Sequence, residues 1–278
     1  MREITYNQIV DAVYGLTEAC TRLTPSCSRA MQEAYDKEND KNAKFALEML
    51  IENAKVAKER KLPVCQDTGM AVVFIRLGQE VHISGGLLQD AVNEGVRRGY
   101  VENGYRASVL DPITRINTRD NTPAVTHVTL VEGDSLKITF LPKGFGSENM
   151  SRLYMLTPSA GIEGVKNSVL DAVKQAGSKP CPPIVVGVGI GGTAEKAMLV
   201  AKEQLLREIG APSEDETLAE LERELLKDIN ALGIGAQGFG GDTTALAVHI
   251  GKYPTHIAAL PVAVNIQCNA ERLSSVAL

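Results

Sequence analysis

Apolar positions follow a helical period in the first part of the chain and mixed periods after it. Between residues 4 and 61 the apolar side chains recur about every 3.6 positions, which predicts a helical N-terminal region interrupted at Pro25. A long helix is expected from about 42 to 61, where Leu62-Pro63 stops it. The side chains expected to face inward from this helix are Phe45, Met49, Leu50 and Ala54.

Beyond residue 70, short apolar and β-branched runs alternate with helical patterns. The run 71–77 predicts a strand, and Gly133-Asp134 between two further runs, 124–131 and 135–142, predicts a hairpin. Other strands are expected at 184–188, 243–250 and 257–266, and other helices near 87–99, 161–176, 193–208 and 213–231. The last of these helices is expected to be capped by Ser213.

These elements together predict a mixed α/β (α+β) fold. A helical N-terminal region is followed by β-sheet segments packed with helices. No internal repeat and no low-complexity linker interrupts the chain, so a single domain is expected over residues 1–278.

Composition identifies an ordinary globular protein, with 44% hydrophobic and 23% charged residues. The net charge of −5 argues against a nucleic-acid surface of the basic kind. No run of 18 apolar residues predicts a membrane span, and no apolar stretch typical of a secretory signal follows Met1. Five widely spread cysteines fit a reducing compartment better than a disulfide framework, so a cytoplasmic protein is expected.

The most concentrated chemistry lies in the segment Pro63–Gly69. Cys65 is a soft metal ligand when ionised, and Gln66 and Asp67 beside it offer hydrogen-bonding and proton-transfer groups. Asp-Thr-Gly is also good turn chemistry, so a purely structural turn is the alternative at this point. The sequence leaves both interpretations open.

Two further cysteines stand at similar places in the predicted structure. Prolines on both sides of Cys181 hold its backbone stiff, and Cys268 follows the last long strand. Cys20 lies on the apolar side of the first helix, and we interpret it and Cys27 as structural thiols. A zinc site built from the other three cysteines is one alternative that the spacing leaves open.

Two other motifs suggest ligand binding. Five arginines between 97 and 119, Arg106 among them, form either an anion clamp or a solvated, salt-bridged surface. Gly187, Gly189 and Gly192 match G-x-G-x-x-G after a strand and before a helix, which is the context of a dinucleotide site. A nucleotide-binding dehydrogenase subunit is therefore a remote alternative.

Six segments together resemble the class I, iron–sulfur, fumarase and tartrate dehydratase family. They are Val-Cys-Gln-Asp-Thr-Gly at 64–69, Asn-Thr-Arg-Asp-Asn-Thr-Pro-Ala at 117–124, Lys-Gly-Phe-Gly-Ser-Glu-Asn at 143–149, Cys-Pro-Pro at 181–183, Gly-Val-Gly-Ile-Gly-Gly-Thr at 187–193 and His-Ile-Ala-Ala-Leu-Pro-Val-Ala-Val at 256–264. They occur in the family's order, and the resemblance as a whole extends over essentially the whole chain and ends where the family's α part ends.

The resemblance implies a [4Fe–4S] cluster with one iron free of protein ligands. The cluster cysteines would be Cys65, Cys181 and Cys268. The implied catalytic residues are Asp67, as a proton-relay or orienting group, and His256, twelve positions before Cys268. The implied substrate contacts are Gln66, Arg106 and Gly146, with Gly144 as the alternative to Gly146.

The resemblance also implies an activity and a partner. The expected reaction is the reversible hydration of fumarate to (S)-malate, a step of the tricarboxylic acid cycle, with tartrate or a methylated malate as alternative substrates. The family's remaining arginine and lysine anchors and its proposed threonine base lie in a β part that nothing here resembles. The chain is therefore expected to be the α subunit of an α₂β₂ enzyme, inactive or nearly so without its β subunit.

Overall fold

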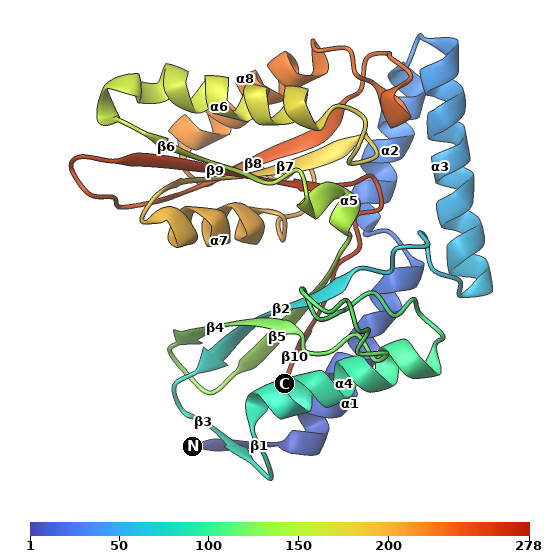
Figure 1. The fold of residues 1–278 in the computed structure, drawn as a ribbon, viewed down its shortest axis with the longest axis vertical. Coiled ribbons are helices and arrows are strands. Elements are labelled where there is room, and N and C mark those ends of the chain that lie inside the picture. Colours follow the sequence, from blue (N-terminus) through green and yellow to red (C-terminus); the bar gives the residue numbers. More distant parts are fainter. The chain divides into compact units, whose positions relative to one another are not determined.

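The computed structural model describes residues 1–278 and divides the chain into two compact units that interleave in sequence. Unit 1 consists of Met1–Thr24, Ala54–Phe145 and Arg272–Leu278, and unit 2 of Pro25–Asn53 and Gly146–Glu271. Both combine helices with sheets, which confirms the mixed α/β class (Figure 1). The division into compact units does not test whether the chain forms a single domain, so that expectation stays a prediction.

Unit 1 contains a four-stranded sheet in the order β10-β5-β2-β4. Its strands are β2 (Met70–Gly78), β4 (Val125–Val131), β5 (Leu136–Lys143) and β10 (Ser274–Ala277). The hairpin expected between β4 and β5 is wrong, because β2 lies between them, parallel to β4 and antiparallel to β5. The short connection between β4 and β5 passes over the end of β2 at Gly78. The N–H of Gly78 donates to the carbonyl of Ser135 in this connection. A side chain on Gly78 would overlap Gly133, so only glycine fits there.

Helices α1 (Tyr6–Leu16) and α4 (Leu88–Glu102) cover one face of this sheet (Figure 1). The two helices approach closely because α4 has glycine at the contact: a Cβ on Gly95 would lie 2.7 Å from the Cβ of Val13. Thr5 caps α1 through a reciprocal capping box with Gln8. A short strand that sequence reasoning missed, β1 (Arg2–Thr5), precedes α1 and pairs in parallel with β3 (Val81–Ser84).

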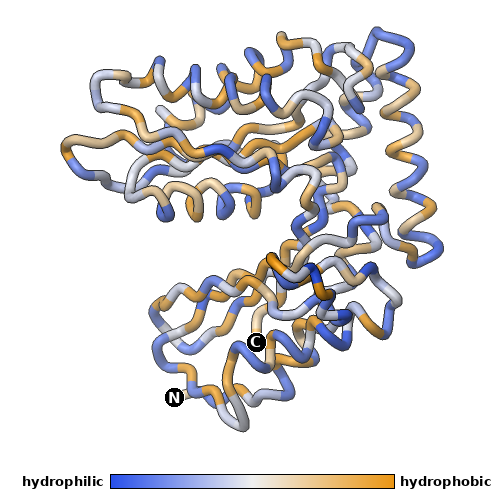
Figure 2. The backbone as a smooth tube through the Cα atoms, viewed as in Figure 1, coloured by the Kyte–Doolittle hydropathy of each residue, from blue (hydrophilic) through white to orange (hydrophobic).

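Unit 2 contains a second sheet, in the order β6-β9-β7-β8. Its strands are β6 (Arg152–Leu156), β7 (Ile184–Gly191), β8 (Ala245–Tyr253) and β9 (Leu260–Gln267). Its helices are α6 (Gly161–Ala176) and α8 (Glu216–Asn230) on one face and α7 (Ala194–Gln204) on the other (Figure 1). The apolar side chains of α6, α8 and the strands form one buried cluster. In Figure 2 the helices of both units alternate between hydrophobic and hydrophilic positions, as expected for helices that pack one face on the protein and expose the other to solvent.

Helix α8 is fixed to β8 by a buried carboxylate. Glu222 accepts from the backbone N–H of Ile250 at 2.7 Å and from Arg207 at 2.6 Å. Beside it, His249 is 2% exposed, and its Nδ1 lies 3.2 Å from the carbonyl of Gln204. The cap of this helix is Asp215, which accepts from two backbone N–H groups, and not the expected Ser213.

The remaining helices are α2 (Pro25–Lys37), α3 (Lys41–Arg60) and the short α5 (Phe145–Glu148). Pro25 opens α2, where its missing N–H costs no hydrogen bond. The length of α3 matches the expectation, but its inward face does not: Phe45 is 61% exposed and Met49 is 45% exposed. Small residues such as Ala43 and Ala57 are buried instead. No helix of the structure combines the length and apolar character needed to cross a bilayer.

Candidate functional site

The segment that carries Cys65 links α3 to β2 and is held within unit 1 by main-chain contacts. The N–H of Val64 donates to the carbonyl of Cys20 at 3.0 Å, and the Cys20 thiol contacts the carbonyl of Thr68 at 3.6 Å. Cys65 is half-buried, and its sulfur lies 3.5 Å from Oε1 of Gln66, whose side chain is exposed. The turn therefore presents a thiol and an amide next to each other.

Both carboxylate oxygens of Asp67 accept hydrogen bonds from backbone N–H groups. Oδ1 accepts from the N–H of Gly69 and Oδ2 from the N–H of Phe145, both at 2.9 Å. The side chain thereby fastens the Cys65 segment to the end of β5. A Cβ on Gly144 would lie 3.4 Å from Oδ2, so the glycine keeps this contact open. The geometry gives Asp67 a structural role, and its proton-relay role stays a prediction.

Arg106 lies beside the same segment. Its carbonyl accepts from the hydroxyl of Thr68 at 3.4 Å and from Nδ2 of Asn121 at 2.7 Å. Asn121, 1% exposed, also accepts from the N–H of Ser108 at 2.6 Å and so fixes the loop. The Arg106 side chain is exposed. Unit 1 thus brings together Cys65, Gln66, Asp67 and Arg106.

Sequence analysis did not identify Arg272, a buried cation that contacts the same segment. Arg272 is 1% exposed and donates from Nη1 to the carbonyl of Asp67 at 3.0 Å. Its Nε has no hydrogen-bond partner, and a Cβ on Gly144 would lie 3.7 Å from Nη2. An arginine four residues after a predicted ligand cysteine was the only signal in the sequence.

Cys181 and Cys268 lie in neighbouring loops of unit 2. The carbonyl of Cys181 accepts from both the N–H of Asn269, at 3.2 Å, and its Nδ2, at 2.7 Å. Asn269 directly follows Cys268 in the chain. Gly146 approaches the same place, since a Cβ there would lie 3.6 Å from the carbonyl of Lys179. Unit 2 therefore brings two of the predicted cluster cysteines and one predicted substrate contact together.

His256 does not join this group. It lies in the exposed loop between β8 and β9, where its Nδ1 accepts from the N–H of Ala258 at 3.2 Å. Cys268 follows the opposite end of β9, and a strand of that length spans roughly 23 Å. The structure thus separates His256 from the cysteines of its own unit, and its catalytic role stays a prediction.

The five thiols fall into two chemical classes. None forms a disulfide. Burial raises the pKa of Cys20 to about 11 and raises that of Cys27 further, so both stay protonated. Cys181 is exposed, and Cys65 and Cys268 are half-buried. The three thiols that solvent reaches are the three that the sequence predicts as cluster ligands.

These thiols suit an iron–sulfur cluster by the nature of their donors, since thiolates are its usual ligands. Cys65 belongs to unit 1, and Cys181 and Cys268 belong to unit 2. Neither unit by itself holds three histidine, cysteine, aspartate or glutamate side chains in an arrangement for a metal ion. The accessible sulfur donors fit the group, and the cluster itself is a proposal.

The glycines of the dinucleotide-like motif have a packing role. A Cβ on Gly187 would overlap the carbonyl oxygen of Ala201, and one on Gly189 that of Ala197. Both glycines lie inside β7, where they let α7 approach the sheet. In a dinucleotide site the first glycine forms the turn after the strand. The geometry therefore disfavours the nucleotide alternative.

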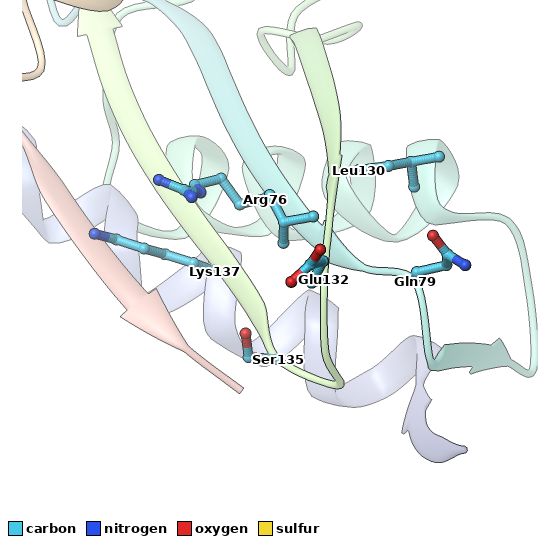
Figure 3. Close-up of a pocket in the computed structure, with 7 residues that line it drawn as sticks. Arg76, Gln79, Leu130, Glu132, Ser135 and Lys137 are labelled. Atoms are coloured by element: carbon cyan, nitrogen blue, oxygen red, sulfur yellow. The ribbon is translucent and has the colours of Figure 1, made fainter.

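An open hollow of about 720 Å³ lies elsewhere in unit 1 (Figure 3). It is lined by Arg76, Gln79, Leu130, Val131, Glu132, Ser135 and Lys137. Arg76 and Lys137 are direct neighbours across β2 and β5, which places two like charges side by side. None of the predicted site residues lines this hollow.

Comparison with known proteins agrees with the motifs. A family model described as fumarate hydratase (Fumerase) matches residues 10–277. A putative L(+)-tartrate dehydratase subunit alpha of Methanocaldococcus jannaschii is 46% identical over 272 residues, which cover 95% of each chain. An L(+)-tartrate dehydratase subunit alpha of Escherichia coli strain UTI89 is 30% identical over 271 residues, covering 96% of this chain and 89% of the relative.

Proposed function

Because this chain belongs to the fumarate hydratase (Fumerase) family and is a hydro-lyase α subunit, we propose that it works as the iron–sulfur subunit of an L(+)-tartrate dehydratase. The names of the two relatives support tartrate over fumarate as the first candidate substrate. Reversible hydration of fumarate to (S)-malate is the second candidate, which the description of the family model favours.

The observation that carries this proposal is the separation of the thiols into two classes. Two cysteines are buried with raised pKa values, and the other three reach solvent from loops at the ends of secondary-structure elements. We propose that Cys65, Cys181 and Cys268 hold a [4Fe–4S] cluster. When bound, such a cluster supplies a Lewis acid at the iron that has no protein ligand, which favours departure of a hydroxide.

The remaining chemistry is assigned to groups of unit 1. Dehydration removes a proton from the carbon next to a carboxylate and breaks the C–O bond of the neighbouring carbon, which yields water and an alkene from malate, or water and an enol from tartrate. The exposed guanidinium of Arg106 binds one substrate carboxylate bidentately. The amide of Gln66 donates to a substrate oxygen, while Asp67 holds the segment in place. We assign no general base to this chain.

A β subunit completes the proposed enzyme. Both relatives carry the word alpha in their names, which implies a second subunit. We propose an α₂β₂ assembly in which the β subunit supplies further substrate contacts and the base. The α chain alone is then expected to be inactive or nearly so.

The test is anaerobic reconstitution of the full chain with iron and sulfide, with and without a tartrate dehydratase β subunit. Iron content, visible absorbance and the dehydration of L(+)-tartrate and (S)-malate are measured. Broad absorbance near roughly 400 nm is expected, and Cys65→Ser, Cys181→Ser or Cys268→Ser should each weaken it. Cys20→Ser, which makes the same change at a buried thiol and keeps a donor for the carbonyl of Thr68, is the matched control and should keep it.

Each measurement in this experiment tests a different part of the proposal. Turnover of tartrate only with the β subunit supports the subunit assignment, and comparable turnover by the α chain alone overturns it. Preferential turnover of malate moves the assignment to the second candidate. A chain that binds one zinc and no iron would replace the cluster by a zinc site.

A further inference from the structure

The backbone of Cys181 adopts a conformation that its residue type does not favour. Its φ is +54°, in the left-handed region that a side chain makes costly for residues other than glycine and asparagine. Its N–H donates to the carbonyl of Ser178 at 3.0 Å, which closes a tight turn after α6. Such a conformation persists only where surrounding contacts determine it. The contacts that do so come from two loops.

The first contact is a double donor from Asn269. Its backbone N–H and its side-chain Nδ2 both donate to the carbonyl oxygen of Cys181, at 3.2 and 2.7 Å. The carbonyl of Asn269 in turn accepts from the buried thiol of Cys27 at 3.4 Å. Because Asn269 is bonded to Cys268, this contact ties the two cysteine loops directly to each other.

The second contact repeats the arrangement one residue later. The backbone N–H and the side-chain Nε2 of Gln237 both donate to the carbonyl oxygen of Pro182, each at 2.8 Å. Gln237 itself has a φ of +54°. Two consecutive carbonyls are therefore each held by the backbone and side-chain amides of a single residue.

Close contacts fix the glycine-rich loop 233–242 on both sides of Gln237. A side chain on Gly235 would overlap the backbone of Gly240 across the loop, and one on Gly238 would overlap Ser178. The loop therefore packs its backbone directly on the turn that ends at Cys181. This loop lies between the motif segments 187–193 and 256–264 and belongs to neither of them.

We propose that Asn269 and Gln237 are positioning residues that set the direction of the Cys181 thiol. Asn269 acts through the backbone carbonyl of Cys181, and Gln237 acts through that of Pro182. Together they hold Cys181 in its left-handed conformation and at a fixed place relative to Cys268. This inference rests on the proposed function, because a preset pair of thiols matters when both must bind the same cluster.

The test uses the full chain with Asn269→Ala and Gln237→Ala, separately and together. Each variant keeps the backbone donor and loses the side-chain donor. After anaerobic reconstitution we expect at least a twofold loss of bound iron and an altered visible circular dichroism spectrum. Far-ultraviolet circular dichroism should stay unchanged. The matched control is Asn103→Ala, which removes another amide-to-carbonyl bond of 2.7 Å, to Gly99, and should leave the cluster spectrum unchanged.

A second readout needs no cluster. In the metal-free chain, release of the turn should raise the alkylation rate of Cys181 at least threefold and leave that of Cys65 unchanged. Gln237→Gly, which tolerates positive φ, serves where an alanine variant does not fold. Equal alkylation rates and spectra in all variants overturn the inference. A wild-type chain that takes up no iron overturns the proposed cofactor, while the alkylation rates still decide the positioning role.

Discussion

Arg272 and Asp67 meet across 205 positions of the sequence, where Nη1 of the arginine donates to the carbonyl of the aspartate at 3.0 Å. The guanidinium is almost fully buried, and its contacts are to carbonyl oxygens of unit 1. A buried cation of this kind holds a backbone segment without exposing its charge. The final residues of the chain thereby fix the segment that carries Cys65.

Replacing Arg272 should therefore destabilise unit 1. Arg272→Ala removes the guanidinium donor from the carbonyls of Asp67 and Pro142, and we expect a loss of about 2 to 4 kcal/mol in the free energy of unfolding. Urea denaturation followed by circular dichroism measures it. Arg22→Ala removes only an exposed ion pair with Glu18 and should cost less than about 0.5 kcal/mol. Equal losses in the two variants would contradict this role.

The glycines of β7 should tolerate no side chain. Gly187→Ala places a methyl group on the carbonyl oxygen of Ala201, and we expect a loss of about 2 to 4 kcal/mol because helix and strand must separate. Thermal and urea unfolding measure it. Gly15→Ala is the control, since a Cβ there meets nothing within 4 Å, and it should stabilise α1 by up to about 1 kcal/mol. A neutral Gly187→Ala would reopen the interpretation of this motif as a ligand loop.

The thiols should react in two groups. With iodoacetamide at pH 8, the native metal-free chain should be labelled at Cys65, Cys181 and Cys268. Cys20 and Cys27 should stay unlabelled, because burial excludes the reagent and keeps their pKa values above the pH of the experiment. Peptide mass spectrometry after timed quenching gives the rates. In urea all five should react alike. Fast labelling of Cys27 in the native chain would show that its burial is misjudged.

His249 should make unit 2 sensitive to acid. Burial, with the nearby Arg207 guanidinium, lowers its pKa to about 4, whereas an unfolded histidine titrates near 6.5. Between these values the unfolded chain binds a proton that the folded chain does not, so stability falls as the pH decreases from about 6.5 to 4. The loss from this group is up to about 3 kcal/mol.

The variant His249→Asn isolates this contribution, because its side chain keeps a donor for the carbonyl of Gln204 and does not titrate. Urea midpoints of both proteins between pH 7 and pH 4 give the difference. The variant is expected to lose less stability over this range than the wild type. Parallel curves for the two proteins would mean that His249 titrates normally.

Sequence patterns predicted those elements in which one period continues over many residues. Helix α6 occupies Gly161–Ala176 as expected, and β2 and α3 differ from expectation by about one residue at each end. The prediction of which face of α3 is buried was wrong, because large apolar residues such as Phe45 are exposed and alanines are buried. Periodicity identifies a helix, but it does not reveal which side meets a partner. The hairpin was wrong because β2, from earlier in the chain, inserts between β4 and β5.

The candidate site was predictable to the extent that its residues carry reactive side chains. Cysteines, Asp67 and Arg106 belong to motifs, whereas Asn269 and Gln237 act on carbonyl oxygens. Any backbone offers such oxygens, so neither spacing nor residue type indicates which carbonyl an amide will contact. The glycines around Gln237 gave the single available hint, since they show that two backbones approach closely there.

The interleaving of the two units sets an order of events during synthesis. Strand β5 obtains its neighbour β10, and Asp67 its contact with Arg272, from residues 272–278. Most of unit 1 leaves the ribosome early, but its sheet stays incomplete until those seven residues follow. All residues of unit 2 are synthesised before residues 272–278. A chain that is free to fold only as far as residue 271 would therefore combine a complete second unit with a first unit that has an open edge strand, and such an edge invites aggregation.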